Sequence, residues 1–156
     1  MLRDVREDDL PIFFEHQREP EANRMAAFPA RERDEFMLHW RTKVMGNPAG
    51  RKRAIVVDGR VVGNIVSWDG AGRRLVGYWI GREYWGRGVA TAALSEFLQE
   101  EPTRPLCAYV AAHNRGSIRV LQKCGFRQVG GVRAGPDGVE EYLFELGAGG
   151  VALPGL

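Results

Sequence analysis

Cysteine is scarce in this chain of 156 residues. Only Cys107 and Cys124 are present, and neither has neighbours at the spacing of metal ligands. Two isolated thiols make neither a disulfide framework nor a zinc site. We therefore expect no bound metal, and we expect Cys124 to pack in the core as a small hydrophobic residue.

Long apolar runs and a large charge of one sign are also missing. No apolar run approaches the roughly 20 residues that cross a bilayer, and no basic stretch followed by an apolar one opens the chain. The 22 lysines and arginines nearly balance the 20 aspartates and glutamates, which leaves a net charge of +2. This charge is too small to favour nucleic acid. We expect a cytoplasmic protein with neither a membrane nor a nucleic-acid partner.

The composition that is present suits one folded domain. Hydrophobic residues make up 44% of the chain and charged residues 27%, which are ordinary values for a globular protein. The length is sufficient for one hydrophobic core. We expect a single domain over residues 1–146 and a flexible, glycine-rich tail over residues 147–156.

One loop stands out because Gly86 and Gly88 separate a predicted strand, Leu75–Ile80, from a segment with apolar residues at helical spacing. Glycine lets the backbone approach a ligand closely, and the first amides of a helix point outward without partners. Arg87 adds a positive charge that suits phosphate. The loop is therefore predicted to bind a phosphate-bearing ligand.

The rest of the chain reads as further strands and helices. Strands fit residues 2–5, 53–57, 60–68, 106–110, 126–132 and 139–146, and helices fit residues 9–17, 33–45, 90–98 and 113–125. Asp58-Gly59 predicts a two-residue hairpin turn, a second turn is expected at residues 136–138, and residues 19–30, with two prolines, are predicted to form a loop. A right-handed crossover would make the strand at 106–110 parallel to the strand at 75–80.

Two motifs flank the strand at 106–110. The first reads Trp85-Gly86-Arg87-Gly88-Val89-Ala90, and the second places Asn114 and Ser117 ahead of Gly125-Phe126. In this order they resemble the two signatures of the GCN5-related N-acetyltransferase family, Gln/Arg-x-x-Gly-x-Gly/Ala and Asn-x-x-Ser/Ala. Trp85 departs from the usual first residue, although Tyr-Trp-Gly is common in the branch that acetylates the N-terminal amines of ribosomal proteins.

The resemblance implies an α/β fold in the order β-α-α-β-β-β-α-β-α-β-β, with a seven-stranded mixed sheet and a splayed central parallel pair. It implies acetyl coenzyme A as co-substrate, with the pyrophosphate on the amides of residues 87–91 and Asn114 on the pantetheine arm. The backbone N–H of Ile80 would polarise the thioester carbonyl. The full set of cofactor contacts that it implies is Trp79, Ile80, Trp85, Gly86, Arg87, Gly88, Val89, Ala90, Thr91, Asn114 and Ser117.

The catalytic groups of the family are incomplete in this sequence. Leu75 stands where many members carry a glutamate base, and Leu121 stands where others carry a tyrosine acid. The resemblance instead implies Ser117 as the group that protonates the thiolate, although a serine at a helix start also caps backbone amides. Candidates for the base are Glu83, Glu21, Asp69 and ordered water. His39 could face the acceptor cleft, and His113, next to Asn114, is expected to shape the turn.

The acceptor would be a primary amine, either a protein N-terminal α-amine or a small molecule. In this family the first two helices and their loop recognise it, which points to Met25, Phe28 and Trp40, although aromatic residues at helical spacing also form cores. A homodimer is expected from the family. The alternative function is a catalytically weak module that binds acyl coenzyme A as a sensor or scaffold.

Overall fold

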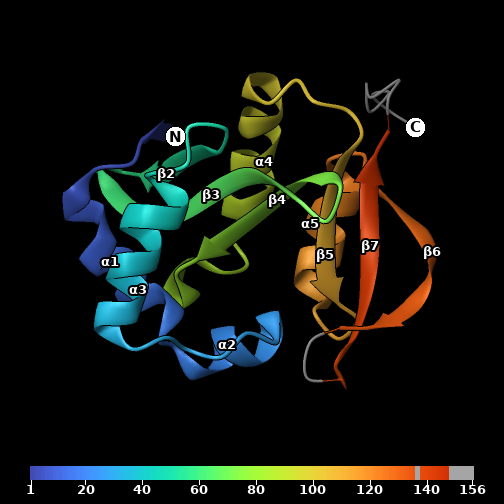
Figure 1. Ribbon diagram of the computed structural model, residues 1–156, viewed down its shortest axis with the longest axis horizontal. Coiled ribbons are helices and arrows are strands. Elements are labelled where there is room, and N and C mark those ends of the chain that lie inside the picture. The colour runs from blue at the N-terminus through green and yellow to red at the C-terminus, as the bar shows by residue number, and fades with distance from the viewer. Residues whose placement is uncertain (136–137, 148–156) are drawn as a thin grey trace.

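The computed structural model describes residues 1–135 and 138–147, which form one seven-stranded mixed sheet with helices on both faces (Figure 1). The strands are β1 (Leu2–Asp4), β2 (Arg51–Val57), β3 (Arg60–Gly70), β4 (Arg73–Ile80), β5 (Leu106–Ala111), β6 (Arg127–Ala134) and β7 (Glu140–Leu146). The helices are α1 (Leu10–Gln17), α2 (Pro20–Ala26), α3 (Arg33–His39), α4 (Val89–Glu100) and α5 (Arg115–Lys123), with short turns η1 (Glu7–Asp9), η2 (Trp40–Val44) and η3 (Arg82–Tyr84). The expected fold class is confirmed.

The sheet order is β1-β2-β3-β4-β5-β7-β6, and β4 and β5 are its parallel pair. The predicted hairpin between β2 and β3 is confirmed, since Asp58 and Gly59 both adopt positive φ angles of 51° and 76°, as a tight hairpin turn requires. The second hairpin, β6–β7, is also present. Residues 136 and 137 of its predicted turn, and residues 148–156 of the predicted tail, lie outside the described residues.

One segment differs from the prediction, because residues 19–30 contain the helix α2 and are not simply a loop. Pro20 occupies the first helical position, where its missing N–H costs nothing. The Glu19 carboxylate accepts a hydrogen bond from the Ala22 amide at 2.8 Å and caps the helix. Ala27, with φ of 53°, ends it in a left-handed conformation. Proline here marks a helix start.

Parallel strands β4 and β5 are paired over only two positions, Arg74 with Leu106 and Leu75 with Cys107. Beyond Leu75 they separate, while β5 continues to pair with β7 from Leu106 to Ala111. The two ribbons diverge toward α2, which lies across the open end (Figure 1). We call this divergence the β4–β5 fork; its closed end is at Arg74 and its open end is at Ile80.

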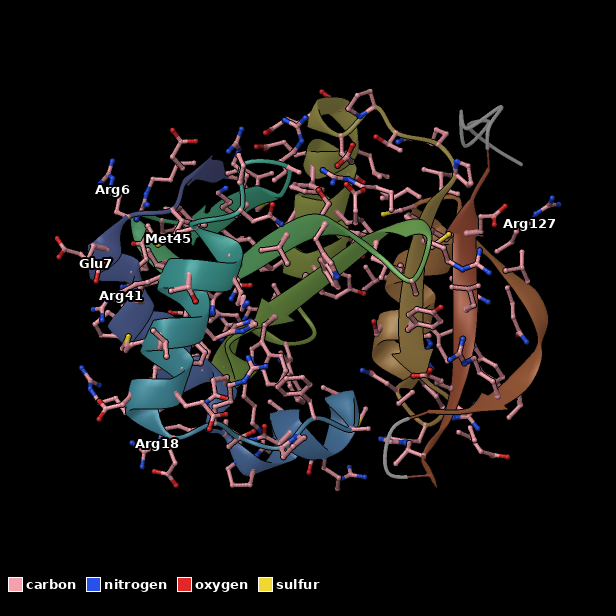
Figure 2. The ribbon with its side chains drawn as sticks, in the orientation of Figure 1. Arg6, Glu7, Arg18, Arg41, Met45 and Arg127 are labelled. Atoms are coloured by element: carbon pink, nitrogen blue, oxygen red, sulfur yellow. The ribbon has the colours of Figure 1, made fainter. Side chains whose placement is uncertain are left out.

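Each face of the sheet has its own core. The larger core joins the sheet to α4 and α5 and includes Phe97, Leu121 and, as expected, Cys124. The smaller core joins the other face to α1 and α3 and contains Trp40. The outer surface at the ends of α1 and α3 is charged: in Figure 2 Arg6, Glu7, Arg18 and Arg41 point away from the protein, and the Arg41 Nε donates to Glu7 at 2.6 Å. None of the described helices is both long and apolar enough to cross a membrane.

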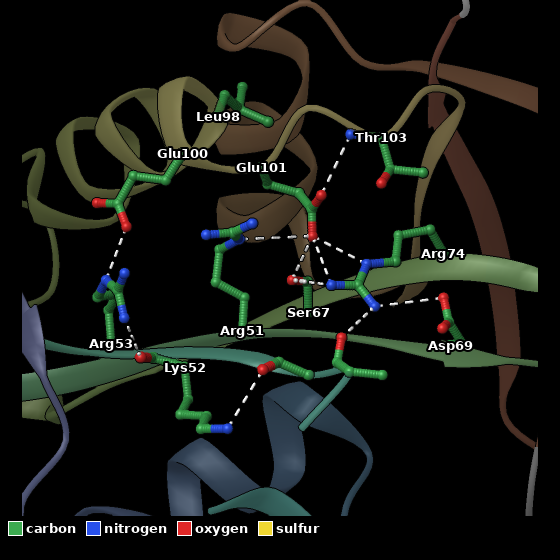
Figure 3. Close-up of polar contacts among 12 residues, drawn as sticks. Arg51, Lys52, Arg53, Ser67, Asp69, Arg74, Leu98, Glu100, Glu101 and Thr103 are labelled. Atoms are coloured by element: carbon green, nitrogen blue, oxygen red, sulfur yellow. Dashed lines mark hydrogen bonds and ion pairs between the residues drawn. The ribbon is translucent and has the colours of Figure 1, made fainter. Parts of the chain in front are cut away.

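A buried ion cluster holds the closed end of the fork (Figure 3). The side chain of Glu101, only 1% exposed, accepts hydrogen bonds from the Ser67 hydroxyl at 2.7 Å, the Arg74 Nε at 2.8 Å and the Thr103 amide at 3.2 Å. Burial by itself raises the pKa of Glu101, but these hydrogen bonds outweigh it and lower the pKa to about 2. The cluster therefore attaches the end of α4 to β3 and β4.

We predict that Glu101→Gln lowers the free energy of unfolding at pH 7 by about 3 kcal/mol, because it removes the buried partner of Arg74 and leaves that charge only the exposed carboxylate of Asp69. Since the folded-state pKa lies below the ordinary value of 4.5, the contribution of the carboxylate is complete above that pH and is lost as the pH falls toward 2. Urea titrations at pH 7 and pH 3 measure both effects.

The matched control is Glu100→Gln. Glu100 makes a more exposed ion pair with the Arg53 Nε at 2.7 Å, so its substitution should cost less than about 1 kcal/mol. Equal stability of the two variants at pH 7 would show that the buried cluster does not hold the fold.

Candidate active site

A cleft of about 400 Å³ lies in the open part of the β4–β5 fork. Its walls come from α2, β4, the loop before α4, the start of α4, and α5. The residues that line it are Ala22, Met25, Ala26, Tyr78, Trp79, Ile80, Tyr84, Trp85, Gly86, Gly88, Val89, Ala90, Thr91, Asn114, Gly116, Ser117, Arg119, Val120 and Lys123. Most of the predicted cofactor residues are therefore together at one site.

The glycine loop leads directly into the N-terminus of α4. Gly86 and Gly88 have φ angles of 75° and 76°, and a β-carbon on either would meet no atom within 4 Å. Gly88 is the N-cap and supplies no side chain, so the first amides of α4 face the open space of the cleft. Amides at a helix N-terminus beside an open space form an anion site. The Arg87 guanidinium lies over the Tyr84 ring at 5.8 Å, at the edge of this loop.

Two tryptophans connect the end of β4 to its surroundings. The Trp85 indole donates a hydrogen bond to the Ile80 carbonyl at 2.9 Å, and the Trp79 indole donates to the His16 carbonyl at 3.1 Å. The first bond fixes the glycine loop to the strand. The second fixes the strand end to α1.

The amide of Ile80 points into the fork. The next amide, that of Gly81, donates to the Val62 carbonyl on β3 at 2.8 Å. Successive amides of a strand point to opposite sides, so the Ile80 N–H faces away from β3. On that side β5 has already separated, since its pairing with β4 ends at Leu75.

At the start of α5 the two predicted residues have different partners. The Asn114 side chain accepts a hydrogen bond from the Ser117 amide at 3.2 Å and is the N-cap of the helix. The Ser117 Oγ lies 2.6 Å from the Tyr78 hydroxyl. The capping role that a serine at this position could have filled therefore belongs to Asn114.

Tyr78 was not predicted as a site residue. It lies on β4 within Leu75–Ile80, and no local signal distinguishes it from a strand tyrosine. Burial raises its pKa to about 12, although the Ser117 hydrogen bond opposes this, so its hydroxyl is protonated at neutral pH. Its place in the site follows from the tertiary fold, which brings β4 opposite α5.

His16 is a second residue that the sequence did not point out. Its imidazole lies against Gly81, where a β-carbon would come within 2.9 Å of the ring. Burial lowers its pKa, while the Glu83 carboxylate opposes this shift. Its Nδ1 is buried and has no hydrogen-bond partner among the described residues. A neutral imidazole thus lies next to the end of β4.

The candidate bases and the two histidines all lie outside the set of residues that line the cleft. Glu83 is exposed on η3, and Glu21 forms an ion pair with Arg24 on α2. Asp69 pairs with Arg74 at the closed end of the fork. His39 is on α3, away from the lining residues. The Nε2 of His113 is 2.7 Å from the Arg24 carbonyl and connects α2 to the segment after β5.

Leu75, in the position of the glutamate base, and Leu121, in that of the tyrosine acid, are both buried among apolar residues. No carboxylate or phenol therefore comes from those two positions. Within residues 1–135 and 138–147, no group of three or more histidine, cysteine, aspartate or glutamate side chains is placed to hold a metal ion.

Of the three predicted acceptor residues, only Met25 lines the cleft. Phe28 is 41% exposed and meets the Trp79 ring edge-on, with centroids 6.2 Å apart. Trp40 is a correction: it is 6% exposed and packs on Phe13 and Phe36 in the core under α1 and α3. Its helical spacing with Phe36 reflected core packing.

Residues 1–127 match the family model described as an acetyltransferase (GNAT) domain, so the chain belongs to the GNAT acetyltransferase family. It is thereby an acyltransferase by class. The search of curated proteins finds no match.

Solved structures share the fold at low sequence identity. A spermidine N-acetyltransferase from Vibrio cholerae, in complex with CoA and spermine, has a TM-score of 0.79 at 16% identity and covers 93% of each chain. A GNAT-family acetyltransferase from Bacillus anthracis has a TM-score of 0.76 at 18% identity, with 92% of each chain covered. The aminoglycoside acetyltransferase AAC(6')-Ib in complex with coenzyme A has a TM-score of 0.74 at 18% identity, again with 92% of each chain covered.

We predict that Asn114→Ala lowers the free energy of unfolding by about 1 kcal/mol, because the Ser117 amide loses its cap. Asn114→Asp should retain the wild-type stability, since a carboxylate at a helix N-terminus also accepts this bond. Urea titration of the three proteins tests this, and equal stability of the alanine variant would contradict the capping role.

Proposed function

We propose that the protein transfers an acetyl group from acetyl coenzyme A directly to a primary amine. One observation carries this proposal. The glycine loop places the N-terminus of α4, with its free backbone amides, in the lining of the cleft beside the open end of the fork. An anion site and an unpaired strand amide in one cleft suit a ligand with a pyrophosphate at one end and a thioester at the other.

The lining supports a specific placement of the cofactor. The pyrophosphate would bind the amides of residues 87–91, and Arg119 and Lys123, the two charged residues of the lining, add positive charge that suits phosphate. Asn114 uses its side-chain oxygen as a cap, which leaves its NH₂ group free to donate to the pantetheine arm. The Ile80 N–H would hold the thioester carbonyl oxygen.

The reaction then needs no covalent intermediate on the protein. The amine attacks the acetyl carbon, the Ile80 amide stabilises the oxyanion, and Ser117 donates to the departing thiolate. We propose that the amine loses its proton to water at the entrance of the cleft or to Glu83, one of the candidate bases.

The acceptor remains a primary amine of either of two kinds. The resemblance to the ribosomal branch favours a protein N-terminal α-amine, whereas the structural neighbours act on spermidine and aminoglycosides. Met25, with Phe28 and Trp79 beside it, would form the apolar wall of the acceptor site. We also propose that residues 1–146 act as one domain, as a homodimer.

Gly88→Val should weaken the binding of coenzyme A by roughly tenfold or more, because the new side chain enters the open space above α4 and costs at least about 1.4 kcal/mol of binding energy. Gly59→Val is the matched control: Gly59 has the same φ of 76° and equally open surroundings, but it lies in the β2–β3 turn. Calorimetric titration with coenzyme A compares them. If both variants bind like the wild type, the loop is not the pyrophosphate site.

The proposed activity is tested by the release of free coenzyme A thiol from acetyl coenzyme A, with spermidine, kanamycin and short peptides with free N-termini as acceptors. We expect release that depends on one of these acceptors. Tight binding of acetyl coenzyme A without release for any acceptor would refute transfer and favour the alternative, an acyl coenzyme A sensor or scaffold.

A further inference from the structure

Tyr78 and Ser117 place two hydroxyl groups against each other inside the cleft. Their oxygens are 2.6 Å apart, and the Tyr78 hydroxyl also donates to the Ser117 carbonyl at 3.4 Å. Both residues line the cleft, one from β4 and the other from α5. The pair therefore joins the two elements that flank the open part of the fork.

Either hydroxyl can donate the short hydrogen bond. Burial raises the pKa of Tyr78 to about 12, so the phenol keeps its proton at neutral pH and can donate. Its contact with the Ser117 Oγ, at 2.6 Å, is much shorter than its contact with the Ser117 carbonyl, at 3.4 Å, which favours the Oγ as its acceptor. When Ser117 accepts this bond, its own hydroxyl hydrogen is available to a third group in the cleft.

The pair lies near the expected reaction centre. Tyr78 is three residues past Leu75, the last β4 residue that pairs with β5, which is about 10 Å into the fork. The Ile80 amide is two residues further, about 7 Å along the strand. A thioester with its carbonyl oxygen on that amide keeps its sulfur in the part of the fork that the pair occupies.

We infer that Tyr78 is a positioning residue for acetyl transfer: its hydroxyl holds Ser117 so that the Ser117 O–H donates to the sulfur of the leaving thiolate. This inference rests on the proposed function. Leu121, one helical turn after Ser117 and in the position of the family's tyrosine, is buried and has no hydroxyl. The phenol in this cleft comes instead from Tyr78 on β4.

The step balances without any further reactant. The nitrogen lone pair of the amine forms the C–N bond, and the C–S bond breaks with its electron pair going to sulfur. The Ser117 hydrogen bond stabilises the negative charge on sulfur while that bond breaks. The proton that finally resides on the thiol is the one lost by the amine nitrogen, carried by water.

The kinetic test compares single and double variants. Tyr78→Phe keeps the ring and removes only the hydroxyl, so we expect kcat to fall about tenfold, the effect of one hydrogen bond in the transition state, with affinity for coenzyme A within about threefold of wild type. Ser117→Ala should be at least as slow. The double variant should be no slower than Ser117→Ala, because Tyr78 acts only through Ser117.

The control is Tyr109→Phe, on the neighbouring strand β5, which should leave kcat unchanged. Unchanged kcat for Tyr78→Phe, or multiplicative losses in the double variant, would overturn the inference.

A second acetyl donor distinguishes a role of Tyr78 in positioning Ser117 from a purely structural role. Acetyl-selenocoenzyme A releases a selenolate, which is a weaker base than a thiolate and needs less stabilisation. The defect of Tyr78→Phe should therefore become clearly smaller with this donor than with acetyl coenzyme A. A purely structural role would slow the two donors equally, and that result would refute the inference.

A measurement on bound coenzyme A needs no acceptor. The ultraviolet absorbance of the thiolate, followed against pH in the complex, should show that the thiol ionises at lower pH in the wild type than in Tyr78→Phe. If the wild type transfers no acetyl group but this difference is present, the proposed function fails and the Tyr78–Ser117 pair stands. Identical titrations would refute the pair, and failure to bind coenzyme A would refute both proposals.

Discussion

β4 and β5 share only two residue pairs before they separate, and the rest of the molecule is arranged around that separation. Backbone amides beyond the last pair still need partners, because a buried amide without one costs free energy. The Ile80 amide and the first amides of α4 meet this condition in the same cleft. The place where the sheet is least complete is thus where backbone donors are left open to a ligand.

A fork of this kind needs a firm closed end. Glu101 supplies it, since one buried carboxylate accepts from β3, β4 and the segment after α4 (Figure 3). The adjacent Glu100 forms a more exposed ion pair with Arg53. The two neighbouring glutamates therefore differ in role because they differ in burial: Glu101 joins buried elements of the fold, whereas Glu100 forms a surface ion pair. The apolar cores on both faces of the sheet complete the support.

Some polar groups of the cleft stabilise the fold, and others are open to a ligand. Asn114 caps α5 by accepting from the Ser117 amide, so the Ser117 hydroxyl is not needed as a cap and forms a hydrogen bond with the Tyr78 hydroxyl. Trp85 holds the glycine loop to the Ile80 carbonyl, on the same residue whose amide faces the fork. Each of these bonds fixes a group that a thioester ligand would contact, so the site is preorganised before any ligand binds.

The sequence by itself determined the strands, the two hairpins, most helices and the glycine loop before α4, because turn residues, apolar spacing and glycine positions act over a few neighbouring residues. It missed α2, which begins at Pro20 behind the cap of Glu19, and it placed Trp40 in the site although that ring packs in a core. Only the tertiary structure decided that Tyr78 meets Ser117, 39 positions away, and that Glu101 meets Ser67, 34 positions away. Such contacts depend on how far two strands stay paired, which no local pattern encodes.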